Sequence, residues 1–512
     1  DAVAGYTLQQ FANDKLFVYA FDFPDNRTGY HNIGAALKPQ KPSNSESSWS
    51  MVSYLARVNY TLDDKYLFTL TGRVDGSSKF AEGNKYGFFP SGAFAWRVSK
   101  ENFMQQVRAV SDLKLRASYG VLGNQAIPPY QSLALVGPYG EGTFHAGSQT
   151  EVYTGQEPLS YVNTKLKWET TRQLDLGIDL SLFNNRVSFT GDYYQKKTFD
   201  LLLSSPIPLT TGFYTTLLNI GNIENHGIDL DLRTLNTTGK FEWTSAFNFS
   251  LNRNKITQIN SETDIILENA LLLRNGVSVG TFYGYIFDGI FQTDAEAAGS
   301  PVLVGQEASS SNPASIAKAG DRKYRDISKD GKIDVNDRTI LGSAMPKFTY
   351  GFTNTFSFRN IDLSVFLQGS YGNKMANFNN YDLLNFTGQN NVLAEAGVNR
   401  WTPENPGTKY PRALAAGSLD QGIFSTAILE DASYLRIKNI TLSYRLSSSA
   451  ASRLGMSNLR VYVSGSNLWT FTKYSGYDPE ANTYGQSTTL VGIDLGGYPQ
   501  TRILQLGLSA SF

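Results

Sequence analysis

The stretch YLFTLTGRVD, residues 66–75, alternates two kinds of side chain along its length. From Tyr66 onward every second residue is apolar or small, and the residues between them are mainly polar. Successive side chains of a β-strand point to opposite faces of the sheet. A strand with this pattern therefore has one face against apolar surroundings and the other face against water.

The same alternation recurs along the rest of the chain. About thirteen segments carry it: 52–62, 65–75, 86–98, 112–122, 172–183, 186–203, 224–235, 240–254, 346–358, 361–372, 433–446, 458–472 and 501–512. Each has roughly the length that a tilted strand needs to cross a bilayer. No run of 18 or more apolar residues occurs, so we expect no transmembrane helix.

The connections between these segments alternate in length. Short ones lie at 63–64, 184–185, 237–239 and 359–360, and long ones cover about 123–171, 255–345, 373–432 and 473–500. Outer-membrane barrels have short periplasmic turns and long extracellular loops. The sequence therefore predicts an all-β protein with a transmembrane antiparallel β-barrel. We expect an extracellular loop region at 1–51 and barrel strands from 52 to 512.

A soluble β-sandwich or propeller is the alternative, because antiparallel sheets with one solvated face also alternate. Against it stand the long strands and the high aromatic content, with 29 Tyr and 31 Phe. Barrels need such residues for their interfacial girdles. The last segment also ends on an aromatic, Phe512, which we expect to serve barrel assembly.

Composition excludes several other classes of protein. The chain has no cysteine, which rules out a disulfide framework and a cysteine-ligated zinc or iron–sulfur site. Lys and Arg total 45, as do Asp and Glu, so the formal charge is zero and no nucleic-acid partner is expected. Asp229 and Asp231 are two residues apart on a predicted strand and line its polar face. Because no nucleophile–base set can be assembled, we do not expect an enzyme.

The segment 326–337 has the spacing of an EF-hand-type loop. The expected ligands are, in order, Asp326, Ser328, Asp330, the backbone carbonyl of Lys332, Asp334 and Asp337. Gly331 stands at the sharp turn. These hard oxygen ligands suit Ca²⁺, and Mg²⁺ less well, although Asp337 is shorter than the usual Glu. The alternative is an ordinary Asp/Gly-rich turn. The ion would have a structural role, pinning the long 255–345 loop.

Aromatic residues in the long loops are candidate substrate contacts. They are Tyr130, Tyr139, Phe144 and Tyr153 in the 123–171 loop, and Tyr381, Phe386 and Tyr410 in the 373–432 loop. Such rings stack on sugar rings or grip peptide side chains. The alternative is that they pack the loops together, since loops carry function but loop aromatics are also common packing.

Several motifs, in order along the chain, resemble SusC/RagA-like TonB-dependent outer-membrane transporters. They are SYLARVNY at 53–60, RVDGSSKF at 73–80, YGFFPS at 86–91, LKLRASYG at 113–120, GNQ at 123–125, NIENHGID at 222–229, RWTPENP at 400–406 and the final strand ending at 512. The stretch 280–291 also resembles the family and is expected to be a loop segment. Family relatives often carry a loop similar to 326–337. Each motif alone is modest, but their number and order make the resemblance specific.

The resemblance implies a barrel of 22 strands filled by an N-terminal plug, a recognised class of large transporter. We therefore expect the plug and the remaining strands in an N-terminal companion fragment, which would also contact TonB. Implied partners are a SusD-like lipoprotein lid, further surface lipoproteins and membrane lipid, with transporter–lid units paired as a dimer. The implied function is active import of oligosaccharides or oligopeptides across the outer membrane of a Bacteroidetes-like Gram-negative bacterium. A surface glycan-binding or adhesin protein and a passive porin are the alternatives.

Overall fold

The computed structural model describes residues 1–27, 29–145, 152–259, 264–308, 310, 312, 315–386, 391–414, 422–485 and 487–512. Within these residues the largest sheet has fourteen strands, in the order β1-β4-β5-β6-β7-β10-β11-β12-β13-β20-β21-β24-β25-β27. The chain divides into two compact units: 1–95, 117–174 and 197–222 form the first, and 96–116, 175–196 and 223–512 form the second. Five strands contribute residues to both units: β6 (Tyr86–Arg97), β7 (Val110–Asn124), β10 (Glu169–Leu182), β11 (Val187–Pro206) and β12 (Thr215–Thr237).

Long antiparallel strands dominate the first unit. Its own elements are β1 (Ala2–Phe17), β2 (Ala20–Phe21), β3 (Lys38–Pro39), β4 (Ser43–Leu62), β5 (Tyr66–Ser77), β8 (Val136–His145), β9 (Val152–Pro158) and 3-10 turns at Gly29–His31, Ile33–Ala35 and Leu209–Thr211. β1 pairs with β4 along its whole length, from Ala2 opposite Val58 to Phe17 opposite Ser43. β4 then pairs with β5 across the three-residue turn 63–65, whose first two residues, Asp63 and Asp64, have positive φ.

The second unit contains further long strands and, between them, many short elements. The long strands are β13 (Phe241–Ile259), β20 (Phe348–Phe358), β21 (Ile361–Tyr371), β24 (Tyr434–Arg445), β25 (Asn458–Thr472) and β27 (Ile503–Ser511). The short strands are β14 (Ile265–Leu267), β15 (Leu271–Leu273), β16 (Thr281–Gly284), β17 (Phe287–Ile290), β18 (Arg322–Tyr324), β19 (Thr339–Ser343), β22 (Lys374–Asn377), β23 (Leu429–Asp431) and β26 (Ile493–Asp494). The helices are α1 (Asp294–Gly299), α2 (Asn379–Leu383), α3 (Ala394–Asn399) and α4 (Ser448–Arg453), with 3-10 turns at Val98–Lys100, Asn102–Met104 and Val335–Asp337.

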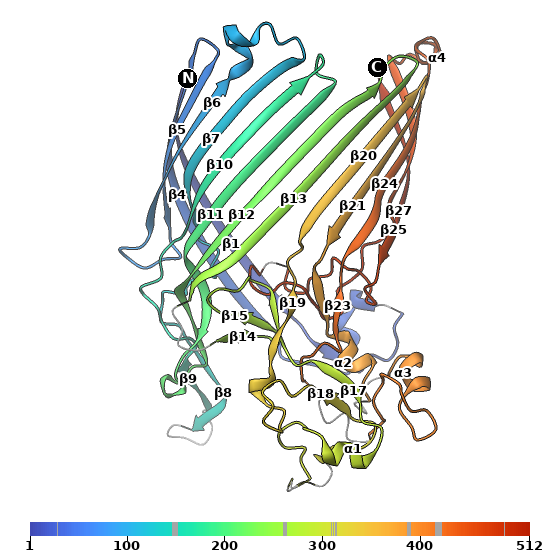
Figure 1. Cartoon of the computed structure of the whole chain (residues 1–512). Coiled ribbons are helices and arrows are strands. Elements are labelled where there is room, and N and C mark those ends of the chain that lie inside the picture. Colours follow the sequence, from blue (N-terminus) through green and yellow to red (C-terminus); the bar gives the residue numbers. More distant parts are fainter. Residues whose placement is uncertain are drawn as a thin grey trace. The chain divides into compact units, whose positions relative to one another are not determined.

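The long strands of the second unit run antiparallel, each hydrogen-bonded to the next. Figure 1 shows β20, β21, β24, β25 and β27 side by side, with the short strands of this unit and the helices α1, α2 and α3 gathered at one end of them. Those short elements come from the connections 255–345, 373–432 and 473–500, which were expected to be loops. Instead of standing apart, these connections fold together into what we call the loop cluster.

A shared core holds the loop cluster together. Its buried residues come from all three connections: Ala270, Leu271, Phe282, Ala376, Phe424, Ile428, Leu429 and Ile493. β22 sits at the centre, because it pairs antiparallel with β23 and parallel with β26. Burial of apolar side chains is the main favourable term in folding, so the three connections stabilise one another.

Each of the thirteen segments expected from the alternation overlaps a strand of the large sheet. The expectation of a loop region over 1–51 is wrong for two stretches, since β1 covers 2–17 and β4 begins at Ser43. The alternation in β1 is broken by Gln9-Gln10 and by Asn13-Asp14. The pairing with β4 therefore makes this segment a strand, and its own pattern does not reveal it.

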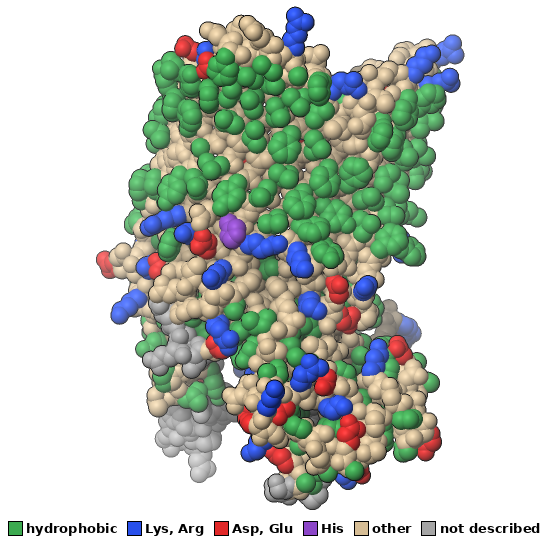
Figure 2. All heavy atoms as spheres, viewed as in Figure 1, with side chains coloured by type: hydrophobic (Ala, Val, Ile, Leu, Met, Phe, Trp, Pro, Cys, Tyr) green, Lys and Arg blue, Asp and Glu red, His purple; other side chains and the backbone are tan. Residues whose placement is uncertain are grey.

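Hydrophobic side chains cover the outward face of the long strands. Figure 2 shows a broad apolar field over the strands, with charged side chains mainly beyond its borders and over the loop end. On β27 the side chains of Leu504, Leu506 and Leu508 are all exposed. Among the residues that the structure describes, no helix is long and apolar enough to cross a membrane.

Candidate functional site

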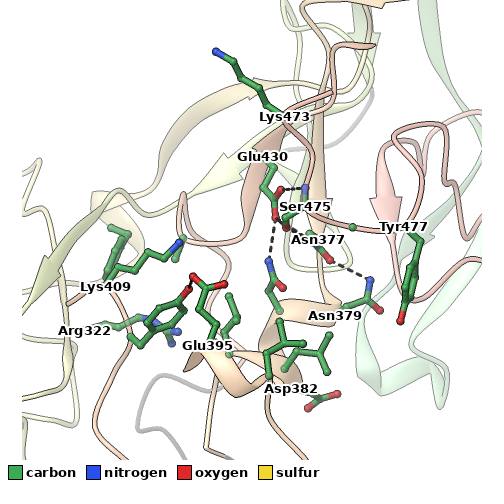
Figure 3. Close-up of a pocket in the computed structure, with 18 residues that line it drawn as sticks. Arg322, Asn377, Asn379, Asp382, Glu395, Lys409, Glu430, Lys473, Ser475 and Tyr477 are labelled. Atoms are coloured by element: carbon green, nitrogen blue, oxygen red, sulfur yellow. Dashed lines mark hydrogen bonds between the residues drawn. The ribbon is translucent and has the colours of Figure 1, made fainter. Parts of the chain in front are cut away.

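A cavity of about 840 Å³ lies in the loop cluster of the second unit. Figure 3 shows it between β22, α2, β23 and the segment that follows β25. Its polar lining consists of Arg322, Asn377, Asn379, Asn380, Asp382, Glu395, Lys409, Tyr410, Glu430, Lys473, Ser475 and Tyr477. The volume falls in the range of sites that take small molecules or short segments of longer ones.

The pairing of β22 with β23 puts one wall of the cavity in place. Ala376 and Leu429 face each other in this ladder and are buried in the shared core. Because side chains alternate along a strand, the next residues, Asn377 and Glu430, point to the other side. There both line the cavity.

Glu430 organises this wall through its carboxylate. Its Oε1 accepts hydrogen bonds from the side-chain amides of Asn377 and Asn380, each at 3.0 Å, and from the Ser475 hydroxyl at 2.7 Å. Its Oε2 accepts one from the Ser475 backbone N–H at 2.7 Å. Hydrogen bonds to an ionised acceptor are the stronger kind. One carboxylate thus fixes residues from β22, α2 and the segment after β25.

Away from this wall lies Glu395 on α3 (Figure 3), which accepts a hydrogen bond from the Tyr410 hydroxyl. Burial and this contact with a carboxylate raise the pKa of Tyr410 to about 12, so the phenol stays neutral. The ammonium of Lys409 lies over the Tyr410 ring, 5.1 Å from its centroid. This part of the lining therefore presents a cation, an anion and an aromatic edge together.

The segment after β25 carries an exposed aromatic between two anchors. Ser475 is tied to Glu430, and Asp478 accepts a hydrogen bond from the guanidinium of Arg436 at 2.6 Å. Between them, the Tyr477 side chain lines the cavity and is 77% exposed. The two anchors hold the backbone on both sides of Tyr477. They therefore set the position of the Tyr477 ring, although the ring itself packs against little of the protein.

Arg436 is the buried centre of the second anchor. It lies on β24, is 2% exposed, and pairs with Asp478 and with Glu480. Burial raises the pKa of the Asp478 carboxyl, but the Glu480 backbone N–H and the Arg436 guanidinium lower it further, so its pKa falls below the ordinary value. The carboxylate therefore stays ionised and holds the segment against β24.

The segment 326–337 forms the sharp turn that the expected calcium loop requires. Gly331 has φ +84°, and its N–H donates to Asp326 Oδ2 at 3.0 Å. Asp337 is fully buried, and its oxygens accept from the backbone N–H groups of Ile327, Ser328 and Asp334 at 2.8–2.9 Å. These contacts outweigh burial and hold the pKa of Asp337 below its usual value.

The side chains of this loop turn toward backbone amides. The remaining expected ligands, Asp330 and Asp334, accept hydrogen bonds from the N–H groups of Lys332 and Asn336. Among the described residues, no group of three or more Asp, Glu or His side chains is arranged to hold a metal ion. The calcium site therefore stays a prediction.

The aromatic residues that were predicted to contact substrate lie in different surroundings, and one of them lines the cavity. Tyr410 lines the cavity, whereas Tyr381 packs against Phe378, with ring centroids 5.2 Å apart. Phe386 is half-buried outside the lining, and the Tyr130 hydroxyl, in the first unit, accepts from the Ser48 N–H at 2.7 Å. The side chains of Tyr139, Phe144 and Tyr153 lie outside the described residues.

Sequence reasoning missed most of the polar lining. Glu430, Asn377 and Ser475 are far apart in the chain, and no spacing rule connects them. The run of three asparagines within 377–380 is a local signal that could have been followed, because amide side chains in a loop bind polar ligands. Tyr477 could have been included with the other loop aromatics.

Comparison with known proteins places the chain among outer-membrane receptors. The family model described as TonB dependent receptor-like, beta-barrel, matches residues 2–468. TonB-dependent receptor P3 of Formosa agariphila is 37% identical over 100% of this chain and 50% of its own length. TonB-dependent receptor SusC of Bacteroides thetaiotaomicron is 30% identical over 90% of this chain and 44% of its own length.

Among solved structures, the RagAB peptide transporter superposes with a TM-score of 0.79 and 25% identity. The match covers 100% of this chain and 53% of the transporter chain. The chain therefore spans about half the length of the curated relatives that it matches.

Proposed function

Because the chain belongs to the TonB-dependent receptor-like β-barrel family, whose members lie in the outer membrane of Gram-negative bacteria, we propose that its protein is an active importer. Energy from TonB would draw a bound nutrient through the barrel. The observation that carries this proposal is the family match over 2–468, together with a preorganised polar cavity in the loop cluster. Long loops of this kind are where barrels place binding residues.

We propose oligosaccharides or oligopeptides as the imported class. The RagAB structures are named for peptide transport. The cavity has both hydrogen-bonding amides and aromatic rings, which suit either kind of chain. The lining residues bind and position the ligand, and no reaction is assigned to them.

The proposed partners follow from the same membership. A SusD-like surface lipoprotein would close over the loop cluster, and a plug-bearing N-terminal part of the same protein would occupy the barrel and contact TonB. Further surface lipoproteins and a dimer of transporter–lid units belong to the same proposal. Support comes from the SusC relative and from the RagAB structures, with which the whole chain superposes.

Uptake by intact cells tests this function. Cells with the gene intact or deleted would receive mixed oligosaccharide and peptide pools, with and without a protonophore that removes the energy source of TonB. Uptake that needs both the gene and the proton-motive force supports the proposal. Uptake that survives the protonophore would indicate a passive porin, and binding without uptake would indicate a surface adhesin.

We also propose that the 326–337 loop holds a structural Ca²⁺. Asp326, Ser328, Asp330, Asp334, Asp337 and the Lys332 carbonyl would be its ligands. The ion would supply positive charge that holds these oxygens together, and Mg²⁺ fits the flexible loop less well. Ligand binding to the folded state raises stability. Thermal unfolding of the purified protein should therefore shift upward with Ca²⁺ and downward with a chelator, and Asp330→Asn should abolish the shift.

A further inference from the structure

The charges around the cavity in the loop cluster are balanced. Its lining has three basic residues, Arg322, Lys409 and Lys473, and three acidic ones, Asp382, Glu395 and Glu430. Two of the acids are already engaged by neutral donors of the protein, since Glu430 accepts from amides and a hydroxyl and Glu395 accepts from a phenol. The cavity therefore has no excess charge that would select an ionised ligand.

Three asparagines also line the cavity. Asn377, Asn379 and Asn380 lie within four consecutive positions, and the Asn379 amide donates to Asn377 Oδ1 at 3.1 Å. An amide offers donors and an acceptor in one plane, and a hydroxyl is both donor and acceptor. Asn377 and Asn380 are buried and donate to Glu430, so the amide that can meet the hydroxyls of a ligand is that of half-buried Asn379.

Tyr477 adds an apolar face to these amides. Its ring is exposed, but the chain is pinned at Ser475 by Glu430 and at Asp478 by the buried Arg436. Figure 3 shows Tyr477 at the end of the cavity next to Asn379. Because the backbone around Tyr477 is already fixed, this segment loses less conformational entropy when a ligand stacks on the ring. A sugar ring has the matching shape, with an apolar C–H face and hydroxyls around its edge.

We propose that this cavity binds a neutral sugar unit of an oligosaccharide, stacked on Tyr477 and hydrogen-bonded to the half-buried amide of Asn379. The proposal rests on the importer function and names its substrate class. A peptide would fill the same space and is the alternative occupant that the test distinguishes.

The test uses the full-length transporter purified in detergent from its native membrane. It is incubated with a pool of neutral oligosaccharides from starch, cellulose, mannan and β-1,3-glucan, and separately with a tryptic peptide pool from casein. Retained ligands are identified by mass spectrometry. We expect retained oligosaccharides, with Tyr477→Ala lowering their affinity about tenfold, the loss that a single stacking contact typically carries.

Two further variants separate ring stacking from a general effect on folding. Tyr477→Phe keeps the ring and should retain wild-type affinity. Tyr498→Ala is the matched control, because Tyr498 is 89% exposed in the same 473–500 connection and does not line the cavity. Each variant must also show the wild-type difference in gel mobility between heated and unheated samples, which reports a folded barrel.

The outcomes distinguish this inference from the importer function. Retention of peptides alone, with uptake still dependent on the proton-motive force, leaves the importer standing and overturns the sugar assignment. Retention of sugars that Tyr477→Ala does not weaken overturns the stacking site. If neither pool is retained and neither is taken up by energised cells, both proposals fail.

Discussion

At the scale of single residues, carboxylates organise the loop cluster. Glu430 accepts four hydrogen bonds that join three segments, and Asp337 accepts three backbone N–H groups that close the 326–337 turn. The spacing of the 326–337 loop was visible in the sequence, since its residues are adjacent. Glu430 was not, because its partners come from positions about 50 residues before it and 45 after it.

Asp337 predicts how the turn responds to acid. Its pKa in the folded protein lies below the ordinary value, so its contribution to stability is present above the unfolded pKa of about 3.9. That contribution is lost as the pH falls through the lower, folded pKa. The protection factors of the amides over 326–337, which are the ratios of the intrinsic to the observed exchange rate at each pH, should therefore be high at neutral pH and fall below about pH 4.

Asp337→Asn should remove most of this pH dependence, since an amide does not titrate in this range. The variant should show faster exchange in the same loop already at pH 7. Exposed Asp294, which begins α1 in the same connection, gives the control variant Asp294→Asn. If the protection factors of the wild-type loop were equal at pH 7 and at pH 3, Asp337 would not hold the turn.

At the scale of elements, the long strands could be predicted and the short ones could not. In each long strand, apolar residues alternate with polar ones because the two faces of the strand meet different surroundings. Thirteen strands could therefore be predicted from their own sequences, without knowing their neighbours. β1 was missed because its pattern is irregular and pairing with β4 defines it. β22 and β26 form two bridges between residues more than 100 positions apart, and no local pattern encodes such pairing.

The buried arginine of β24 gives an element-scale prediction. Arg436→Met leaves Asp478 and Glu480 without their cation, and breaking a buried ion pair in this way typically costs about 3–5 kcal/mol. The segment 473–480 should lose its protection from proteolysis, and the protein should unfold at a lower temperature. Arg453→Met, at the end of the exposed helix α4, should leave both properties unchanged.

A double variant separates charge from packing. Adding Asp478→Asn and Glu480→Gln to Arg436→Met removes the two orphaned charges and should recover part of the lost stability. If Arg436→Met has the same unfolding temperature and the same rate of proteolytic cleavage as the wild type, the ion pairs do not hold this segment.

At the scale of the whole molecule, the family match confirms the resemblance that the scattered motifs indicated. The apolar outward face and the membrane location then imply that side chains on alternate positions of a strand meet different solvents. β27 provides adjacent residues for this comparison: Leu506 is 75% exposed on the outward face, and Gln505 points to the other face, opposite Ser464. In a soluble protein, a side chain at position 505 and one at position 506 would both face water. In a membrane barrel, the side chain at 506 would face lipid and the one at 505 would face the polar side of the sheet.

Leu506→Arg should therefore impair assembly in the outer membrane, since an arginine facing lipid costs about 2–4 kcal/mol near the bilayer midplane. Gln505→Arg should assemble normally, because the same side chain then faces the polar side of the sheet. The measurement is the fraction of each variant that reaches the membrane with heat-modifiable gel mobility. Equal assembly of the two would mean that the outward face of β27 does not meet lipid. A defect confined to Leu506→Arg fits no soluble sheet, because a soluble protein has water at both exposed positions.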